Sequence, residues 1–421
     1  MSKKKQAKQE WKPTKKHISN LKKQQRKQKI ILFSGIGVIC VAMVFVLLGL
    51  VFQWYIPKVK PLKDVAIEVN GTKFKMNYFI DAVKYQTQGY PAEIIPYFLD
   101  SVANNIINGE LTRQYADKMG YSVTDKEVDN YLKEHDIKAN AAIKDYVHTY
   151  LLQTRLIDEH FKSLLPEETE LRTAQAMFLE SQSQVNEVIE RLNNGEDFKE
   201  IAKELSLDDS TRETSGDLGK HPAGIIANSE LEELVFSHGI GLHSSYDEDK
   251  GKKVGYWIIE VLERNDDEIK PLVNARVMLL SSNEEAVAVL EKLESGEDFD
   301  KLAEEYSSVW SKETGAFLEE IGPEEISEAF DAYVFSEEQP VNEVSPPIKD
   351  DDQSTKGGYW LYNVQAIENG PISEEDASTL SYLALEDWVK EIRDNEDNVI
   401  DNKIDDEKKD FALEIITGGK A

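Results

Sequence analysis

The sequence predicts an α+β protein with a single transmembrane helix, a helical domain and two tandem small α+β domains. An uncharged apolar run extends from Ile30 to Tyr55, and apolar positions at helical spacing follow it. The phrase RLNNGEDFKEIAKELS, which starts at Arg191, recurs about 100 positions later as KLESGEDFDKLAEEYS from Lys292. Solenoid units repeat every 20–50 residues or so. The longer spacing therefore indicates a duplicated domain.

The two copies keep their motifs at nearly constant spacing, which predicts one fold with loops of different length. The offset is 101 residues between Leu192 and Leu293, and 103 between Trp257 and Trp360. We divide the chain into a basic tail (1–29), a transmembrane signal anchor (30–55), a helical domain (58–170), the two copies (171–265 and 272–368) and a C-terminal helix with an acidic tail (369–421).

The N-terminus predicts a single-pass protein of the cell membrane. Residues 1–29 hold twelve Lys or Arg and one acid, a net charge of +11, and about twenty apolar residues cross a bilayer as a helix. The positive-inside rule puts the basic tail in the cytoplasm and residues 58–421 outside. Ile39 before Cys40 and the lack of an A-x-A-like site favour an anchor over a cleaved signal. A nucleic-acid or lipid contact is the alternative interpretation of the basic tail.

Charge and cysteine use restrict the partners of the outer part. Subtracting the +11 of the tail from the net charge of −30 leaves −41, which argues against nucleic acid as a partner. The outer part contains no cysteine, so it folds without disulfides. We expect no cofactor and no metal, since the spacing of His221, His238 and His243 fits no zinc pattern.

The segment before the duplication predicts a hairpin followed by helices. Asn70–Gly71 is a turn signal between two alternating strands, and a long helix then ends at Gly120. Thr124 and Glu127 form a capping box for the next helix, and further helix covers residues 143–165.

Each copy predicts the order β-α-α-turn-α-β. Ser181 and Ser282 cap the first helix of each copy, and Ser215-Gly216-Asp217-Leu218-Gly219 forms a glycine turn in the first. The opening strands are residues 174–179 and 275–280, and the closing strands are residues 255–261 (GYWIIEV) and 358–364 (GYWLYNV).

The repeated phrase, the glycine turn and the closing strand together resemble the parvulin family of peptidyl-prolyl isomerases. The G-x-x-V-(S/T)-x-x-E-V ending at residues 120–128 looks like the N-terminal chaperone domain of SurA and PrsA-type foldases. This resemblance implies an extracytoplasmic folding factor that binds unfolded or exported polypeptides. It leaves the formation of oligomers open.

Prolyl isomerisation needs an apolar pocket and polar groups that favour the twisted amide over the planar one. The family pattern supplies histidines on the first and last strands, an Asp or Cys in the Ser-rich loop, and an apolar pair for the proline ring. Here the first-strand positions are Ala176 and Val277, and the last-strand positions are Trp257 and Trp360. All four histidines are missing, so the resemblance implies weak activity.

The resemblance carries one catalytic candidate, Asp208, and Ser307 falls near its place in the second copy. A solvated loop acid is the alternative for Asp208. The candidate substrate-binding residues are Ile226, Leu231, Trp257, Ile326, Phe330 and Trp360. Core packing is the alternative for all six, whereas the two indoles could instead stack on proline rings.

The leading hypothesis is therefore a chaperone with two parvulin-type domains. The alternatives are a non-enzymatic chaperone or peptide-binding scaffold and a purely structural envelope protein. We also expect a helix from Ser373 to dock on the helical domain, and we expect residues 394–410 to be mobile because they are acidic and weakly apolar.

Overall fold

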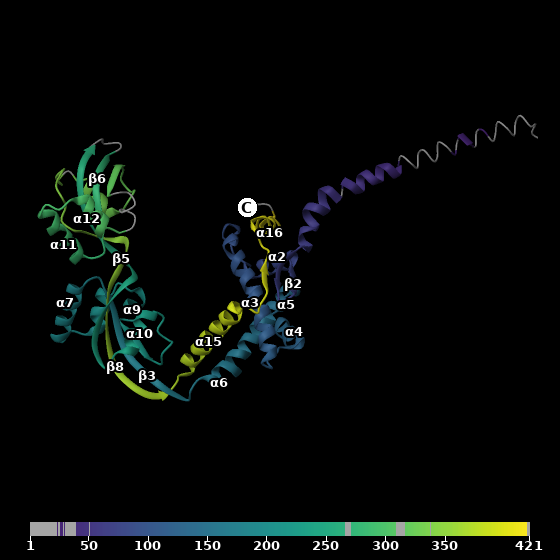
Figure 1. The fold of residues 1–421 in the computed structure, drawn as a ribbon, viewed down its shortest axis with the longest axis horizontal. Helices are drawn as coiled ribbons and strands as arrows, with labels where there is room; N and C mark the ends of the chain where they lie inside the picture. The colour runs from purple at the N-terminus through teal and green to yellow at the C-terminus, as the bar shows by residue number, and fades with distance from the viewer. Residues whose placement is uncertain are drawn as a thin grey trace, which may run out of the picture. The chain divides into compact units, whose positions relative to one another are not determined.

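The computed structural model describes residues 23, 26, 27, 29, 39–49, 51–265, 271–308, 316–336 and 338–418. They form two compact units (Figure 1). The first contains the chain up to Glu159 and again from Ala384, and the second contains His160–Leu383. Most of the basic tail and residues 30–38 of the predicted anchor lie outside the described residues.

The described part of the predicted anchor is one long apolar helix. It covers Ile39–Val59, its most apolar 18-residue stretch has a mean hydropathy of 2.4, and it ends in the π-helix η1 (Val51–Val59). None of its most apolar stretch is buried against the rest of the chain. Its length and composition suit a membrane span, and the anchor itself stays a prediction.

The first unit contains a β-hairpin and the helices packed against it. In the hairpin, β1 (Val65–Val69) and β2 (Thr72–Lys75) pair antiparallel. Asn70 and Gly71 at its turn have φ of 49° and 87°, as a type I′ turn requires, so the predicted hairpin is confirmed. The other elements are η2 (Pro61–Lys63), α2 (Met76–Gln86), η3 (Ala92–Phe98), α3 (Leu99–Lys118), α4 (Asp125–Glu134), α5 (Ala141–Arg155) and η4 (Leu156–Phe161).

The predicted helix ends of this unit are confirmed. Gly120 follows α3 with φ of 87°, a conformation that favours glycine. At the start of α4 the Thr124 hydroxyl accepts the Glu127 amide at 3.4 Å, and the Glu127 carboxylate accepts the Thr124 amide at 2.7 Å. This is the capping box.

The C-terminal part completes the first unit through α15 (Glu374–Asp394), β9 (Ile400–Asn402) and α16 (Asp406–Thr417). Ile392 of α15 belongs to the core of this unit, which confirms the predicted docking of the helix. β9 pairs antiparallel with β1 and makes a three-stranded sheet. The side-chain oxygen of Asn398 accepts a hydrogen bond from the side-chain Nδ2 of Asn70 at 2.8 Å. The prediction that residues 394–410 are mobile is therefore wrong, because polar and backbone groups far away in the sequence hold them.

The second unit is built on a six-stranded sheet with the order β4-β3-β8-β5-β6-β7. All its pairings are antiparallel. Two strands are unusually long, with 25 residues in β5 and 24 in β8. The strands are β3 (Glu168–Leu179), β4 (Asp217–His221), β5 (Gly241–Asn265), β6 (Leu272–Leu280), β7 (Phe317–Ile321) and β8 (Ile348–Pro371).

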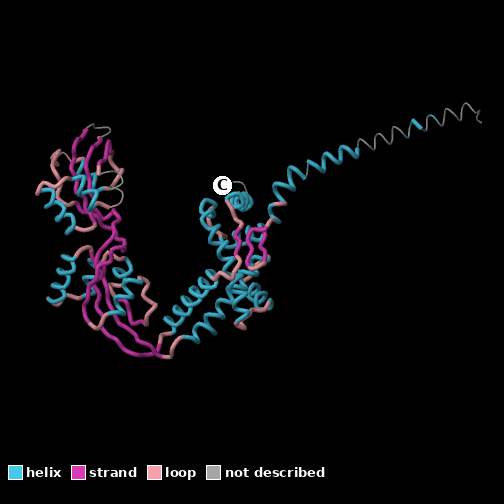
Figure 2. The backbone as a smooth tube through the Cα atoms, in the orientation of Figure 1, coloured by secondary structure: helices cyan, strands magenta, loops and turns pink. Residues whose placement is uncertain are grey.

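The two long strands exchange the closing strands of the two copies (Figure 2). The closing strand of the first copy, at 255–261, pairs with β6 of the second copy. The closing strand of the second copy pairs with β3 of the first. We call the set of β4, β3, residues 358–371 and residues 241–247 the first lobe. The second lobe contains β7, β6, residues 254–265 and residues 348–354.

The exchange occurs because each of the two long strands continues straight from one lobe into the other. Residues 251–253 pair with residues 354–356, so β5 and β8 cross together from one lobe to the other. The sequence boundaries 171–265 and 272–368 therefore describe the repeat along the chain, whereas each lobe in space combines both copies.

Helices cover both faces of each lobe. In the first lobe the Ser181 hydroxyl accepts the Gln184 amide at 3.2 Å, and in the second Ser282 accepts the Glu285 amide at 3.2 Å, so both predicted caps are confirmed. The helices are α6 (Lys162–Leu164), α7 (Gln182–Asn193), α8 (Phe198–Leu205), α9 (Asp209–Glu213), α10 (Ser229–Ser237), α11 (Asn283–Glu294), α12 (Phe299–Tyr306) and α14 (Glu328–Val334).

A lysine is buried where the two long strands cross. Lys252 is 4% exposed, and its ammonium donates to the carbonyl oxygens of Lys356 (3.2 Å) and Gly357. Burial lowers the pKa of Lys252 to about 8, because an apolar environment disfavours the charged form.

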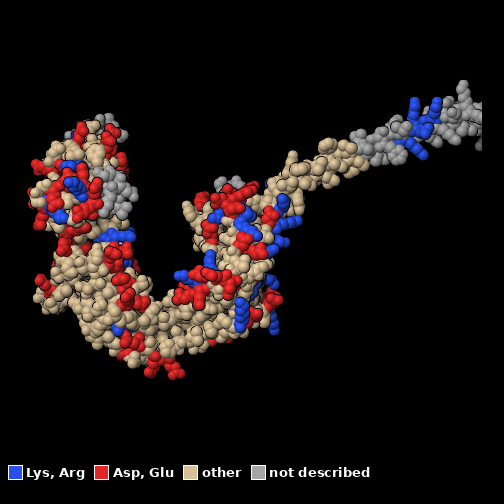
Figure 3. All heavy atoms as spheres, in the orientation of Figure 1, with Lys and Arg blue, Asp and Glu red and all other residues tan. Residues whose placement is uncertain are grey.

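Acidic side chains are spread over the visible face of both units (Figure 3).

Candidate functional site

The exchange decides which candidate residues come together. Ile226 and Leu231 of the first copy pack with Trp360 of the second copy. Ile326 and Phe330 of the second copy pack with Trp257 of the first. Each predicted pocket is therefore assembled from both copies, and neither contains the tryptophan of its own copy.

Both tryptophans are core residues in this conformation. Each is 0% exposed. The ring of Trp360 lies 4.9 Å from that of Phe178, and the ring of Trp257 lies 5.5 Å from that of Phe330. Leu231 and Phe330 are also buried, whereas Ile226 and Ile326 are partly exposed. Of the two interpretations, core packing describes the indoles as they stand, since neither offers a face to a peptide.

Each indole N–H is bound by an aspartate from the other copy. Trp360 Nε1 donates to Asp247 at 3.1 Å, and Trp257 Nε1 donates to Asp350 at 2.8 Å. In the second lobe Asp350 is 1% exposed and also accepts the Ser327 hydroxyl. Paired in this way, the indole N–H groups are not free to donate to a ligand.

Asp208 is held firmly in the first lobe, at the start of α9. One carboxylate oxygen accepts the Ser210 hydroxyl at 2.5 Å and the Thr211 amide at 2.9 Å, and the other accepts Lys250 Nζ at 2.6 Å. Burial acts to raise the pKa of Asp208, but the hydrogen bonds from Lys250 and the two cap groups outweigh it and lower the pKa below its usual range. Asp208 is thus an ionised acceptor near neutral pH and a poor proton donor.

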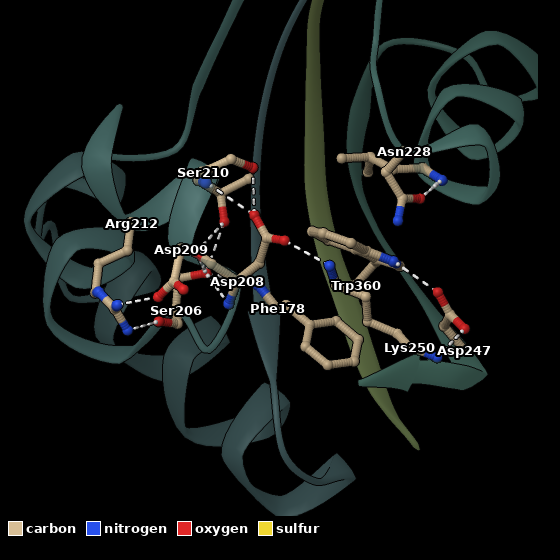
Figure 4. A network of polar contacts seen from close by, with 12 residues as sticks. Phe178, Ser206, Asp208, Asp209, Ser210, Arg212, Asn228, Asp247, Lys250 and Trp360 are labelled. Carbon is tan, nitrogen blue, oxygen red and sulfur yellow. Dashed lines mark hydrogen bonds and ion pairs between the residues drawn. The ribbon is translucent and has the colours of Figure 1, made fainter. Parts of the chain in front are cut away.

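Lys250 is a site residue that sequence reasoning missed. Its ammonium lies beside Asp208 and 5.6 Å from the centre of the Trp360 ring (Figure 4). Asp247 fixes the backbone at Lys250, because its Oδ1 accepts the backbone amides of Asp249 (3.1 Å) and Lys250 (2.9 Å). The available signal was Asp247, since aspartate side chains often accept backbone amides two or three residues further on, but this signal does not show the distant partner of Lys250.

The second lobe lacks an equivalent of the Asp208–Lys250 pair within its described residues. Ser307 accepts the backbone amide of Leu279 at 3.0 Å, and Ser206 does the same for Phe178 at 3.0 Å. Ser307 thus matches Ser206 rather than Asp208. Residues 309–315 lie outside the described part of the chain, including Thr314 and Gly315 of the predicted turn.

His221, His238 and His243 lie in two separate places. His221 Nδ1 lies 2.7 Å from an Asp376 carboxylate oxygen, whereas His238 and His243 have ring centres 5.0 Å apart and lie beside Tyr362. Within the described residues, no three His, Cys, Asp or Glu side chains are placed to bind a metal ion. The two first-strand histidine positions, Ala176 and Val277, are fully buried among apolar side chains.

Three segments of the chain match known protein families. Residues 21–154 match the SurA-like N-terminal domain, and residues 165–265 and 280–366 each match the PPIC-type PPIase domain. The chain thus combines a SurA-like N-terminal domain with two domains of the peptidyl-prolyl isomerase type. The resemblance drawn from the motifs is confirmed.

Curated relatives of this chain carry the names PrsA and SurA. Foldase protein PrsA of Caldanaerobacter subterraneus subsp. tengcongensis is 28% identical over 208 residues, which is 42% of this chain and 67% of that protein. Chaperone SurA of Hahella chejuensis is 27% identical over 293 residues, 65% of this chain and 61% of that protein. The match to PrsA of Oceanobacillus iheyensis covers 53% of that protein. The chain thus spans about half to two thirds of these relatives' length.

Solved structures of PrsA are also similar in part. The crystal structure of PrsA from Bacillus anthracis covers 75% of this chain and 94% of its own, with 14% identity and a TM-score of 0.26.

Proposed function

We propose that this chain is a membrane-anchored extracytoplasmic folding factor that binds unfolded or exported polypeptides and isomerises their Xaa-Pro bonds. The observation that carries this proposal is the combination of a SurA-like N-terminal domain with two PPIC-type domains in one chain. Residues 30–55 would anchor it, with residues 58–421 outside the membrane. The acidity of that part, −41 in net charge, suits a protein partner better than a nucleic acid.

Within this proposal the first lobe carries the isomerase activity. It holds a part-buried ion pair, Asp208–Lys250, whose ammonium lies 5.6 Å from the ring of Trp360. Trp360 belongs to the apolar cluster that contains Ile226 and Leu231. The second lobe pairs its buried Asp350 with Trp257 and Ser327. Isomerisation makes and breaks no covalent bond, so a fixed charge beside an apolar surface suffices for some catalysis.

The test uses the full-length chain in detergent micelles and short Xaa-Pro peptides. We expect cis-to-trans conversion to exceed the uncatalysed rate, and we expect Asp208→Ala to abolish most of the excess. Asp209→Ala is the matched control, because Asp209 is an exposed neighbour whose carboxylate pairs with Arg212. Equal activity in wild type and Asp208→Ala would remove the first lobe from the proposal.

Binding without catalysis is the second candidate function, and the burial of both indoles favours it. Trp257 and Trp360 occupy the last-strand histidine positions and leave no indole N–H free. Suppressed aggregation of an unfolded client, together with no acceleration of the isomerisation of any Xaa-Pro peptide, would identify a chaperone without isomerase activity.

Labelling of single cysteines on either side of residues 30–55 in intact cells would test the anchor.

A further inference from the structure

The first lobe lacks the hydrogen-bond donors that its fold family uses, and the structure suggests what replaces them. Ala176 stands at the first-strand histidine position, and Trp360, at the last-strand position, has its only N–H committed to Asp247. Asp208 is an ionised acceptor. None of the three can donate a hydrogen bond to a peptide.

Lys250 is a charged donor beside these residues. Its Nζ lies 2.6 Å from Asp208, and its side chain keeps 23% of its surface exposed. An ammonium has three N–H donors, and Asp208 is the only hydrogen-bond partner recorded for Lys250 Nζ in the described part of the chain. Two donors are therefore left for a ligand at the solvent side.

The position of Lys250 is fixed by three contacts from different parts of the chain. Asp247 binds the backbone amide of Lys250 through one carboxylate oxygen and the Trp360 indole through the other. Asp208 binds the ammonium itself, and the Trp360 ring lies below it at 5.6 Å. Figure 4 shows Lys250 extending between Trp360 and Asp208. A group held in this way loses little conformational freedom when it binds.

We propose that Lys250 is a catalytic residue of the first lobe, donating a hydrogen bond to the nitrogen of a twisted Xaa-Pro amide. The inference rests on the isomerase function proposed above and names the group that performs it. In the planar amide the nitrogen lone pair is delocalised into the carbonyl. As the bond twists, the lone pair returns to nitrogen, and that nitrogen becomes an acceptor.

A donor at this point therefore binds the transition state better than the ground state, which is the condition for catalysis. A charged donor makes a stronger hydrogen bond than a neutral one. No bond is formed or broken and no proton leaves Lys250. Asp208 is then a positioning residue, since it acts on the substrate only through Lys250.

The experiment compares kcat/KM of the full-length wild type with Lys250→Met, Lys250→Arg and Lys253→Met on one Xaa-Pro peptide. Lys253 is an exposed lysine three residues further along β5 and serves as the matched control. We expect Lys250→Met to lose 10-fold or more, mainly in kcat, Lys250→Arg to keep part of the activity because it restores a charged donor, and Lys253→Met to match wild type. Hydrogen exchange of residues 174–179 checks that each variant keeps the fold of the lobe.

Two further results separate this inference from its alternatives. If Lys250 is the donor, Asp208→Asn loses less than Lys250→Met, and the double variant is no worse than Lys250→Met alone. Wild-type activity in a folded Lys250→Met variant would overturn the inference and leave the isomerase function standing. A wild type without any activity would overturn both, and that measurement comes first.

Discussion

Because the closing strands are exchanged, a substitution in the closing strand of one copy should destabilise the lobe that contains the opening strand of the other copy. Trp360 belongs to the second copy along the chain, but it is buried in the first lobe against Phe178. Truncation of a fully buried Trp to Ala costs about 3–5 kcal/mol. Trp360→Ala should therefore destabilise the first lobe by that amount and leave the second lobe largely unaffected.

Hydrogen exchange of the full-length chain, followed by mass spectrometry, measures this directly. The opening strands at 174–179 and 275–280 report on the first and second lobes, because each pairs with the closing strand of the other copy. We expect Trp360→Ala to speed exchange at 174–179 by about two to four powers of ten if the lobe opens as a unit. Hydrogen exchange at 275–280 should stay close to its rate in the wild type.

Trp257→Ala is the matched control and should give the mirror image. Trp257 is equally buried, and its N–H is bound to Asp350, so its removal also leaves a buried carboxylate with one donor fewer. Such a loss adds about 1–3 kcal/mol. If Trp360→Ala instead deprotected 275–280 and spared 174–179, each copy would close its own sheet and the exchange described here would be refuted.

Three other predictions concern single side chains. The pKa of Lys252 in the folded chain is about 8, below its ordinary 10.5. Between these pH values the unfolded chain binds more protons than the folded chain, so the free energy of unfolding rises with pH by up to about 3 kcal/mol. Lys252→Met should remove this rise. The urea midpoints of wild type and variant at pH 7.5 and pH 10 test this, and an equal change in both would contradict it. Asn398→Ala should cost about 1–3 kcal/mol and speed exchange in β1, because the side chain joins the C-terminal segment to the hairpin and to Tyr115; Asp397→Ala, next to it, should have little effect. Thr124→Ala should cost about 1 kcal/mol through loss of the capping box, and Thr124→Ser should restore it; identical urea midpoints for all three would argue against the cap.

Much of the fold could be predicted because the relevant signals are local. The hairpin turn at Asn70–Gly71 needs two residues that accept positive φ, and the caps at Thr124, Ser181 and Ser282 need a side-chain oxygen three residues before an amide. Such features depend on neighbours within one turn of chain, so the printed sequence contains everything needed to recognise them.

The candidate site was predictable only in part. Asp208 was found because its loop matches the family pattern, but its partner Lys250 lies 42 residues away. The predicted mobility of 394–410 failed for the same reason, because composition does not show that β1 offers a free edge to β9. Contacts between distant segments depend on the packed structure, and no spacing rule specifies them.

The sequence by itself determined that two copies of one domain exist, which residues form their strands and helices, and which side chains face the core. It could not decide which closing strand completes which sheet. The strands GYWIIEV and GYWLYNV have the same alternation, and both tryptophans take the same register: Trp360 lies opposite Phe178 and Trp257 opposite Leu279, positions 101 residues apart. Either strand satisfies the hydrogen bonds and apolar face of either lobe. Only the tertiary structure makes the choice, because it depends on whether residues 248–253 and 351–357 turn back or continue straight, and here they pair with each other and continue.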